Sequence, residues 1–353
     1  MSGEPLLTLR NLHKRFPIIG SKKVVRALNG VDLVVHRGQT LSLVGESGSG
    51  KTTVGRCIAG LIDPDDGEIV YDGLPMTRRR NIRSPELRGK IQMVFQEPTE
   101  SLDPRMTVGA SLAEPLAYLD MPRQERAQRM AETAKRIGLK PALLERYPSE
   151  LSAGILQRIG IGRAIITRPA LIILDEPTSA LDPTARAAIV DLLFQLQREL
   201  GTAYLFISHD LSTVRHLSHD VAVLYLGAVL EKGRAQDVFT LPRHPYSSVL
   251  LASALLPHPS LKPSSRLRLE GEIPSPIDLP PGCTLASRCP FAEAACHARM
   301  PPVEEVSPGH LARCINSARL VESANRLTQF DEFQALAQRV LGRRGQPKAE
   351  PRP

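Results

Sequence analysis

The sequence predicts an α/β fold in which a parallel sheet core carries an inserted helical subdomain and is followed by a small cysteine-containing C-terminal extension. Strand and helix patterns alternate from residue 6 to about residue 240, which is typical of a parallel sheet. Strand patterns give way to helical ones from about residue 100 to residue 165. From about residue 242 prolines become frequent, and four of the five cysteines lie in residues 241–325.

Each element of the sheet region follows from its local pattern. Apolar or β-branched runs predict strands in residues 6–12, 32–35, 40–44, 90–95, 171–174 and 203–207. Residues 51–61 predict a helix that begins directly after a glycine-rich turn, and residues 127–137 are amphipathic with helical spacing. Two further runs, 221–225 and 228–231, predict a hairpin that turns at Gly227.

The extension is expected to be largely irregular. Seven prolines between residues 257 and 281 disfavour a long helix or a central strand there. Residues 326–353 are expected to form a short terminal helix, over 330–341, and a disordered tail, over 345–353.

Composition excludes some classes of protein. No apolar run approaches the roughly 18 residues that span a bilayer, and the N-terminus lacks a secretory pattern, so we expect a cytoplasmic protein. The net charge of +8 is scattered along the chain, and with no Trp, 6 Tyr and 8 Phe few side chains could stack on bases. We therefore expect no nucleic-acid partner, whereas a basic surface near anionic lipid fits the charge.

The glycine-rich turn after residues 40–44 matches the phosphate-binding pattern G-x-x-x-x-G-K-[ST]. Its residues are Gly45, Glu46, Ser47, Gly48, Ser49, Gly50, Lys51 and Thr52, followed by Thr53. Between a strand and a helix, the backbone N–H groups of such a P-loop bind phosphate oxygens. Lys51 is expected to reach the β- and γ-phosphates, and Thr52 to bind Mg²⁺ through its hydroxyl. A flexible Gly/Ser loop, the alternative, does not explain the Lys-Thr pair at this place.

Two acids, Asp175 and Glu176, end the apolar strand 171–174 and are followed by the turn 177–182. In P-loop proteins an acid at this place holds Mg²⁺, so we expect that role for Asp175. Glu176 is the candidate general base for a water molecule that attacks the γ-phosphate. A solvated acid pair is the alternative, but it fits poorly with the apolar strand and the immediate turn.

Gln96 and His209 each follow another predicted strand. Because ligands bind beyond the carboxyl ends of parallel strands, Gln96 is expected to touch the metal and the attacking water. His209 is expected to bond the γ-phosphate and orient the base. The Ser-His-Asp tripeptide of His209 occurs again at 218–220, before a strand, so we interpret His219 as a capping or surface residue. Phe16 is a candidate for stacking on adenine, or a packing residue after the first strand.

The five cysteines fall into two groups. Cys57 stands alone in an apolar helical pattern, where a buried small hydrophobic side chain is expected. The other four lie within 32 residues: Cys283, Cys289, Cys296 and Cys314. In a reducing cytoplasm such a group indicates metal or iron–sulfur ligation rather than disulfides, or no shared role.

Residues 6 to about 240 resemble the ATP-binding subunits of ABC transporters. The resemblance rests on the P-loop, Gln96, the run 150–182 and His209, which occur in the family's order. It implies a RecA-like P-loop NTPase core over residues 1–240, with ATP and Mg²⁺ bound between two such subunits. It further implies two transmembrane permease subunits, a second ATP-binding subunit and an extracytoplasmic substrate-binding protein as partners, and a peripheral place on the cytoplasmic face of the membrane.

The extension narrows the resemblance. His244-Pro245-Tyr246, residues 271–276, and the two segments around Cys283 and Cys289 are similar to the C-terminal region of oligopeptide and dipeptide permease ATPases. The resemblance implies import of di- or oligopeptides, and a four-iron–four-sulfur cluster on the four cysteines. Five, six and seventeen residues separate these cysteines, which is no ferredoxin spacing, and zinc is the alternative. Nickel and glutathione importers share this architecture, so the cargo stays open.

The signature motif departs from the family pattern Leu-Ser-Gly-Gly-Gln. This chain has Leu151, Ser152, Ala153, Gly154 and Ile155. The resemblance places Ser152 and Gly154 on the partner's γ-phosphate, and both are present. Ala153 restricts the backbone where glycine is usual, and Ile155 removes an amide. Because the resemblance implies a second, different ATP-binding subunit, we expect a heterodimer with two unequal ATP sites.

Two other functions compete with this interpretation. A soluble DNA-repair or ribosome-associated ABC ATPase usually has two nucleotide units in one chain or a long inserted coiled coil, and neither pattern occurs. A metal-regulated binding module with a vestigial nucleotide site would not need the complete set of P-loop, acidic and histidine residues.

Overall fold

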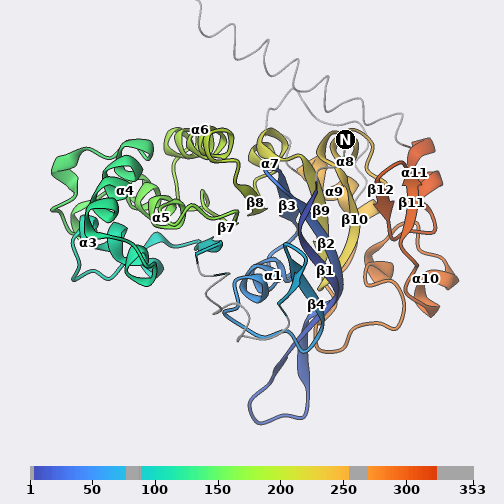
Figure 1. Cartoon of the computed structure of the whole chain (residues 1–353). Helices are drawn as coiled ribbons and strands as arrows, with labels where there is room; N and C mark the ends of the chain where they lie inside the picture. The colour runs from blue at the N-terminus through green and yellow to red at the C-terminus, as the bar shows by residue number, and fades with distance from the viewer. Residues whose placement is uncertain (1–3, 77–86, 88, 254–268, 324–353) are drawn as a thin grey trace, which may run out of the picture.

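The computed structural model describes residues 4–76, 87, 89–253 and 269–323 (Figure 1). The expected terminal helix at 330–341 and the tail at 345–353 lie outside the described residues. None of the helices in the described ranges is long and apolar enough to cross a membrane.

The main sheet has eight strands in the order β11-β12-β10-β9-β3-β8-β7-β6. The five from β9 to β6 are parallel, which confirms the predicted parallel core, and β10 pairs antiparallel with β9 as the predicted hairpin. The bounds are β3 (Thr40–Val44), β6 (Ile91–Val94), β7 (Leu171–Asp175), β8 (Ala203–Ile207), β9 (Asp220–Tyr225), β10 (Ala228–Arg234), β11 (Glu304–Ser307) and β12 (His310–Ala312).

A second sheet is antiparallel, in the order β2-β1-β4-β5. Its strands are β1 (Pro5–Pro17), β2 (Val24–His36), β4 (Asp66–Tyr71) and β5 (Leu74–Pro75). The prediction that residues 6–12 and 32–35 belong to the parallel sheet is therefore wrong. Only a short turn joins β1 to β2, and a parallel pair needs a crossover of a dozen or more residues.

The structure has helices at both places predicted in the sheet and inserted regions, α1 near 51–61 and α4 near 127–137, and residues 98–165 contain helices and 3₁₀ turns without a strand. The α-helices are α1 (Lys51–Ile58), α3 (Val108–Ala113), α4 (Arg123–Arg136), α5 (Ala153–Ile165), α6 (Pro183–Leu200), α7 (Leu211–Leu217), α8 (Ala235–Thr240), α9 (Pro245–Ser253), α10 (Ala294–Ala298) and α11 (Ser317–Ser323). The 3₁₀ turns are η1 (Pro98–Ser101), η2 (Glu114–Tyr118), η3 (Pro141–Leu143), η4 (Pro148–Glu150) and η5 (Ala286–Arg288). Helix α1 is shorter than predicted because Gly60, with a left-handed φ of 67°, ends it.

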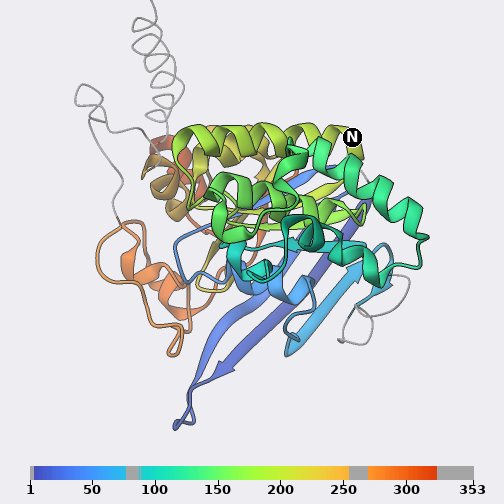
Figure 2. The same cartoon turned by 90° about the vertical axis from the view of Figure 1, so that its left-hand side faces the viewer.

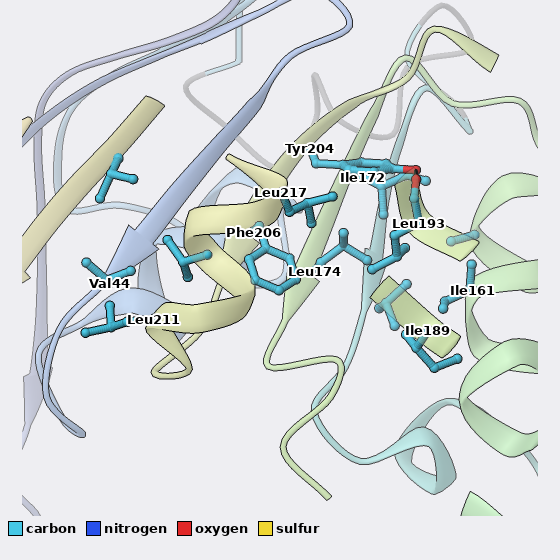
Figure 3. Close-up of a cluster of buried hydrophobic side chains, with 14 of the residues drawn as sticks. Val44, Ile161, Ile172, Leu174, Ile189, Leu193, Tyr204, Phe206, Leu211 and Leu217 are labelled. Carbon is cyan, nitrogen blue, oxygen red and sulfur yellow. Dashed lines mark hydrogen bonds between the residues drawn. The ribbon is translucent and has the colours of Figure 1, made fainter. Parts of the chain in front are cut away.

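The main sheet separates two hydrophobic cores because successive side chains of a strand point to opposite faces. On β7, Ile172 and Leu174 face one core, and Leu171 and Ile173 face the other. The second core is closed by α1 and the antiparallel sheet, and contains Cys57 as predicted. The first is closed by α5, α6 and α7, and its labelled residues in Figure 3 are Val44, Ile161, Ile172, Leu174, Ile189, Leu193, Tyr204, Phe206, Leu211 and Leu217.

The extension is joined to the edge of the main sheet. Strand β12 pairs with β10, and β11 pairs with β12, so the extension adds two strands at the end opposite to β6. The helical subdomain and the extension therefore lie at opposite ends of the strand order, as the green part at the left and the orange to red part at the right of Figure 1 show; in Figure 2 the green helices face the viewer.

Candidate active site

Four neighbouring parallel strands of the main sheet have their carboxyl ends on the same side of the fold. The P-loop follows β3, Glu176 follows β7, and His209 and Gln96 lie two residues beyond β8 and β6. Because β3, β8, β7 and β6 are adjacent, their carboxyl ends bring these predicted residues to one side of the fold.

The backbone of the P-loop depends on its glycines. Gly45 has a φ of 152° and Gly50 a φ of 107°, values that favour glycine. A Cβ at Gly45 would lie 2.1 Å from the carbonyl oxygen of Leu224, and one at Gly50 would lie 2.5 Å from that of Ala27. The loop therefore lies directly against neighbouring backbone, and no larger residue fits at either place.

Lys51 is buried inside the turn of the loop. Its Nζ donates to the carbonyl oxygens of Gly45, at 2.9 Å, and Glu46, at 2.8 Å. Burial lowers the pKa of Lys51, and the carboxylates of Glu176 and Asp175 oppose that effect. The ammonium group is thus held at the loop by carbonyls that it can exchange for phosphate oxygens.

Thr52 and Asp175 form a direct pair. The Thr52 hydroxyl donates to Asp175 Oδ1 at 3.0 Å. Burial raises the pKa of the Asp175 carboxyl, and the Thr52 hydrogen bond opposes the shift. A hydroxyl and a carboxylate oxygen side by side are ligands that Mg²⁺ prefers, so the donor set fits that ion.

Glu176 and His209 also meet. His209 Nδ1 lies 3.1 Å from Glu176 Oε2, with His209 largely exposed and Glu176 mostly covered. The Glu176 backbone has a φ of 46°, which is rare outside glycine, and its N–H donates to the Ile207 carbonyl at 2.9 Å. His219 lies at the other end of the sheet, where its Nδ1 accepts the N–H of Thr40 at 3.1 Å.

The remaining predicted ATP-site residues differ in their exposure to solvent. Ser47 and Gly48 are exposed, Thr53 is half-buried and Ser49 is buried. Gln96 is exposed. Phe16 lies near the end of β1, opposite Val25, with the Lys14 ammonium 5.5 Å from its ring centre. For Gln96 and Phe16 the sheet positions are therefore defined, whereas their contacts with nucleotide stay predictions.

The altered signature lies at the start of α5, in the helical subdomain (Figure 1). Ser152 is the exposed N-cap residue and caps no backbone N–H with its side chain. Ala153 opens the helix, where alanine is a favourable residue, and Gly154 follows it. Ile155 packs against the first hydrophobic core. The structure therefore gives Ile155 a packing role in place of the missing amide.

Two contacts at Glu46 were not predicted. The Tyr246 hydroxyl oxygen accepts the Glu46 N–H at 2.8 Å. Arg288 Nη1 lies 3.4 Å from Glu46 Oε2 and donates to the Tyr225 hydroxyl at 3.1 Å. The His-Pro-Tyr tripeptide and the Arg288-Cys289 pair stand out in the sequence, but nothing local connects them to the P-loop.

The four extension cysteines are free thiols that line one cavity of about 20 Å³, next to His244 and Phe291. Burial raises the pKa of three of them, that of Cys314 to about 12. Within the described ranges no group of three or more His, Cys, Asp or Glu side chains is arranged to hold a metal ion. The expectation of a four-iron–four-sulfur cluster therefore has no support in this geometry.

Comparisons with protein families match two parts of the chain. A family model described as "ABC transporter" matches residues 28–179. A second, described as "Oligopeptide/dipeptide transporter, C-terminal region", matches residues 230–296. The second match begins in β10 and ends in α10, so it includes both segments that reach Glu46.

Curated relatives cover most of the chain. It is 43% identical over 320 residues to "Oligopeptide transport ATP-binding protein OppF" of Salmonella typhimurium, which covers 88% of this chain and 96% of that protein. It is 40% identical over 317 residues to "Probable peptide ABC transporter ATP-binding protein y4tS" of Sinorhizobium fredii, which covers 88% and 90%.

Solved structures match the sheet core. The cbiO1 protein of Clostridium perfringens, described as part of the ABC transporter complex cbiONQ, has a TM-score of 0.59 at 29% identity, over 67% of this chain and 91% of that chain. The ATP-binding cassette MJ0796, bound to ADP and Pi in a dimer, has a TM-score of 0.58 at 30% identity, over 65% of this chain and 98% of that chain.

Proposed function

This chain belongs to the ATP-binding subunits of ABC transporters, in the oligopeptide/dipeptide permease family, and from that premise we propose that it hydrolyses ATP to power import of di- or oligopeptides. The observation that carries the proposal is the convergence of Lys51, the Thr52–Asp175 pair and the Glu176–His209 pair at one sheet edge. The match of the extension to a peptide-transporter region supports the cargo class.

The chain's own residues divide the work at the ATP site. The P-loop amides and Lys51 would bind the phosphates, while Thr52 and Asp175, together with Gln96, would hold Mg²⁺. When bound, that ion neutralises charge on the phosphate oxygens. Glu176 takes a proton from the water whose oxygen attacks the γ-phosphorus, and the bond to the leaving ADP oxygen breaks. His209 holds the Glu176 carboxylate in place from the open side of the site.

In the proposed assembly, a dimer of ATP-binding subunits is bound to two transmembrane permease subunits at the cytoplasmic face of the membrane. An extracytoplasmic substrate-binding protein delivers the peptide to the permease subunits. Ser152 is exposed at the start of α5 and so is available to a second subunit. A partner chain with an intact signature would complete the site on this P-loop. The site completed by this chain's Ser152 and Gly154 would be the weaker one, because Ile155 replaces an amide.

Reconstituted transport tests the main proposal. The chain is assembled with its permease subunits in vesicles, and ATP hydrolysis and uptake are measured with di- and tripeptides, Ni²⁺ and glutathione as competing cargo. Peptide-dependent hydrolysis is expected, and stimulation by Ni²⁺ or glutathione alone would refute peptide import. In the same vesicles Glu176→Gln should bind ATP normally and lose most hydrolysis, whereas wild-type turnover would remove Glu176 as the base.

Single substitutions test the unequal sites. Ile155→Gln in the assembled transporter should raise turnover, because it restores the amide. Ala153→Gly is the matched control and should change little, since alanine already suits the first turn of α5. Unchanged turnover in Ile155→Gln would show that the altered signature does not limit hydrolysis.

For the cysteines, an iron–sulfur cluster remains a proposal that comes from the resemblance, with zinc as the alternative. Four thiols around one cavity are suitable donors in kind, although the described residues show no arrangement of three or more ligands that would hold a metal ion. An assay for iron, labile sulfide and zinc on anaerobically purified protein distinguishes these proposals. About four irons and four sulfides per chain would support the cluster, and their absence would refute it.

A further inference from the structure

Two segments of the C-terminal extension reach the same residue of the P-loop. Tyr246, in the first turn of α9, accepts the backbone N–H of Glu46 through its hydroxyl oxygen at 2.8 Å. Arg288, the last residue of η5, lies 3.4 Å from the Glu46 carboxylate. These contacts span 200 and 242 residues of sequence, so only the packing of the extension on the sheet creates them.

The Tyr246 side chain is held rigidly. It is buried at 1% exposure, and its ring centre lies 4.7 Å from that of Tyr225. Its own N–H donates to His244 Nδ1 at 3.1 Å. The fully buried carboxylate of Glu231 accepts the N–H groups of Arg243 and His244, at 2.7 and 2.9 Å. The hydroxyl of Tyr246 therefore cannot turn away from the P-loop without disturbing this anchored segment.

The Arg288 guanidinium is also placed by its surroundings. Its Nη1 donates to the Tyr225 hydroxyl at 3.1 Å, and the side chain is 11% exposed beside Glu46, which is 33% exposed. The positive group thus faces a carboxylate that is part of an anion-binding loop. It offsets a negative charge that would otherwise repel phosphate.

We propose that Tyr246 and Arg288 are positioning residues for this chain's own ATP site, so that the extension holds the P-loop in the shape that binds MgATP. The proposal rests on ATP binding at the P-loop and is independent of the cargo. The peptide group between Gly45 and Glu46 is held at both ends, by Tyr246 at the Glu46 N–H and by Lys51 at the Gly45 carbonyl. When Lys51 turns to the phosphates of ATP, the Tyr246 hydroxyl still accepts the N–H of this peptide group.

The ion pair between Arg288 and Glu46 allows the most direct test of this proposal. Arg288→Gln leaves the Glu46 carboxylate without its partner, so MgATP should bind about threefold more weakly to the full-length chain. Glu46→Gln added to that variant removes the repelling charge and should restore affinity. Asp278→Asn is the matched control, because it breaks another ion pair between the core and the extension, with Lys23 at 2.9 Å, away from the P-loop.

The hydroxyl contact is tested in the same way. Tyr246→Phe leaves the Glu46 N–H without its acceptor, and the dissociation constant for MgATP should rise about tenfold. Tyr204→Phe is the control, because it also removes a buried hydroxyl, one that donates to the Leu193 carbonyl at 3.0 Å in the core. It should lower the melting temperature without changing ATP affinity.

Isothermal titration of each variant with MgATP, together with KM and kcat in the assembled transporter, is the measurement. The expected result is a raised dissociation constant and KM with kcat nearly unchanged for Arg288→Gln and Tyr246→Phe, and recovery in the Glu46→Gln double variant. Equal affinity in all variants, or a double variant as weak as Arg288→Gln, overturns the positioning role. A wild-type chain that binds no MgATP would overturn the proposed function as well.

Discussion

Replacing Gly45 by alanine probes the backbone requirement at the start of the P-loop. The added Cβ would lie 2.1 Å from the Leu224 carbonyl oxygen and 3.0 Å from Ser49 Oγ, so the loop or β9 must move. The φ of 152° costs a residue other than glycine about 1–3 kcal/mol. Overpacking adds about 1–3 kcal/mol, so we expect Gly45→Ala to lower the free energy of unfolding by about 2–6 kcal/mol.

Gly48 supplies the matched comparison within the same loop. It also has a positive φ, 76°, but an added Cβ meets no heavy atom within 4 Å. Gly48→Ala should therefore lose only the left-handed strain, about 1–2 kcal/mol. The two variants differ in the contacts with Leu224 and Ser49 and in the φ angle of the substituted residue.

Urea unfolding of the nucleotide-free chain, followed by circular dichroism because the chain has no Trp, measures both losses. Gly45→Ala should be less stable than Gly48→Ala by about 2 kcal/mol. Losses equal within about 0.5 kcal/mol would refute the reasoning that the Leu224 carbonyl excludes a side chain here.

Three further outcomes follow from buried groups. Burial raises the pKa of Asp175 above its value in the unfolded chain, so the ionised carboxylate destabilises the fold. Asp175→Asn should therefore raise the urea midpoint at pH 7, and this gain should shrink as the pH falls through the pKa of the folded state. An unchanged midpoint at pH 7 would contradict the destabilising role of the ionised carboxylate. Burial raises the pKa of Cys57 to about 12, so iodoacetamide at pH 8 should modify it only after unfolding, and mass spectrometry that finds equal labelling in the folded chain would exclude such protection. Glu231→Gln replaces one carboxylate oxygen by an NH₂ group that faces a backbone N–H or His310, so the free energy of unfolding should fall by about 2–3 kcal/mol. An unchanged Tm would contradict the anchoring role of the buried carboxylate.

The sequence predicted the central strands well and the edges poorly. Strands β3, β7 and β8 are buried on both faces, so apolar residues predominate in their sequences. Strands β4, β11 and β12 were missed, because short strands at or near a sheet edge carry polar residues without clear alternation. The pairing of β1 with β2 was also missed, since a strand pattern does not state its partner.

For the site, local chemistry selected the P-loop, Asp175, Glu176 and His209 as candidates. Each lies just after an apolar run, and adjacent parallel strands bring their ends to one edge. The choice of His209 over His219 followed from which end of a strand each occupies. The contacts Thr52–Asp175 and Glu176–His209 agree with that order.

The sequence by itself determined the phosphate-binding chemistry of this protein, because that chemistry resides in consecutive residues whose spacing sets their geometry. Only the tertiary structure decided that Tyr246 and Arg288 meet Glu46, and that four cysteines spread over 32 residues of sequence line one small cavity. The physical reason is that contacts between residues hundreds of positions apart depend on how the extension packs against the sheet. A local sequence pattern does not state the distance between two segments that are far apart along the chain.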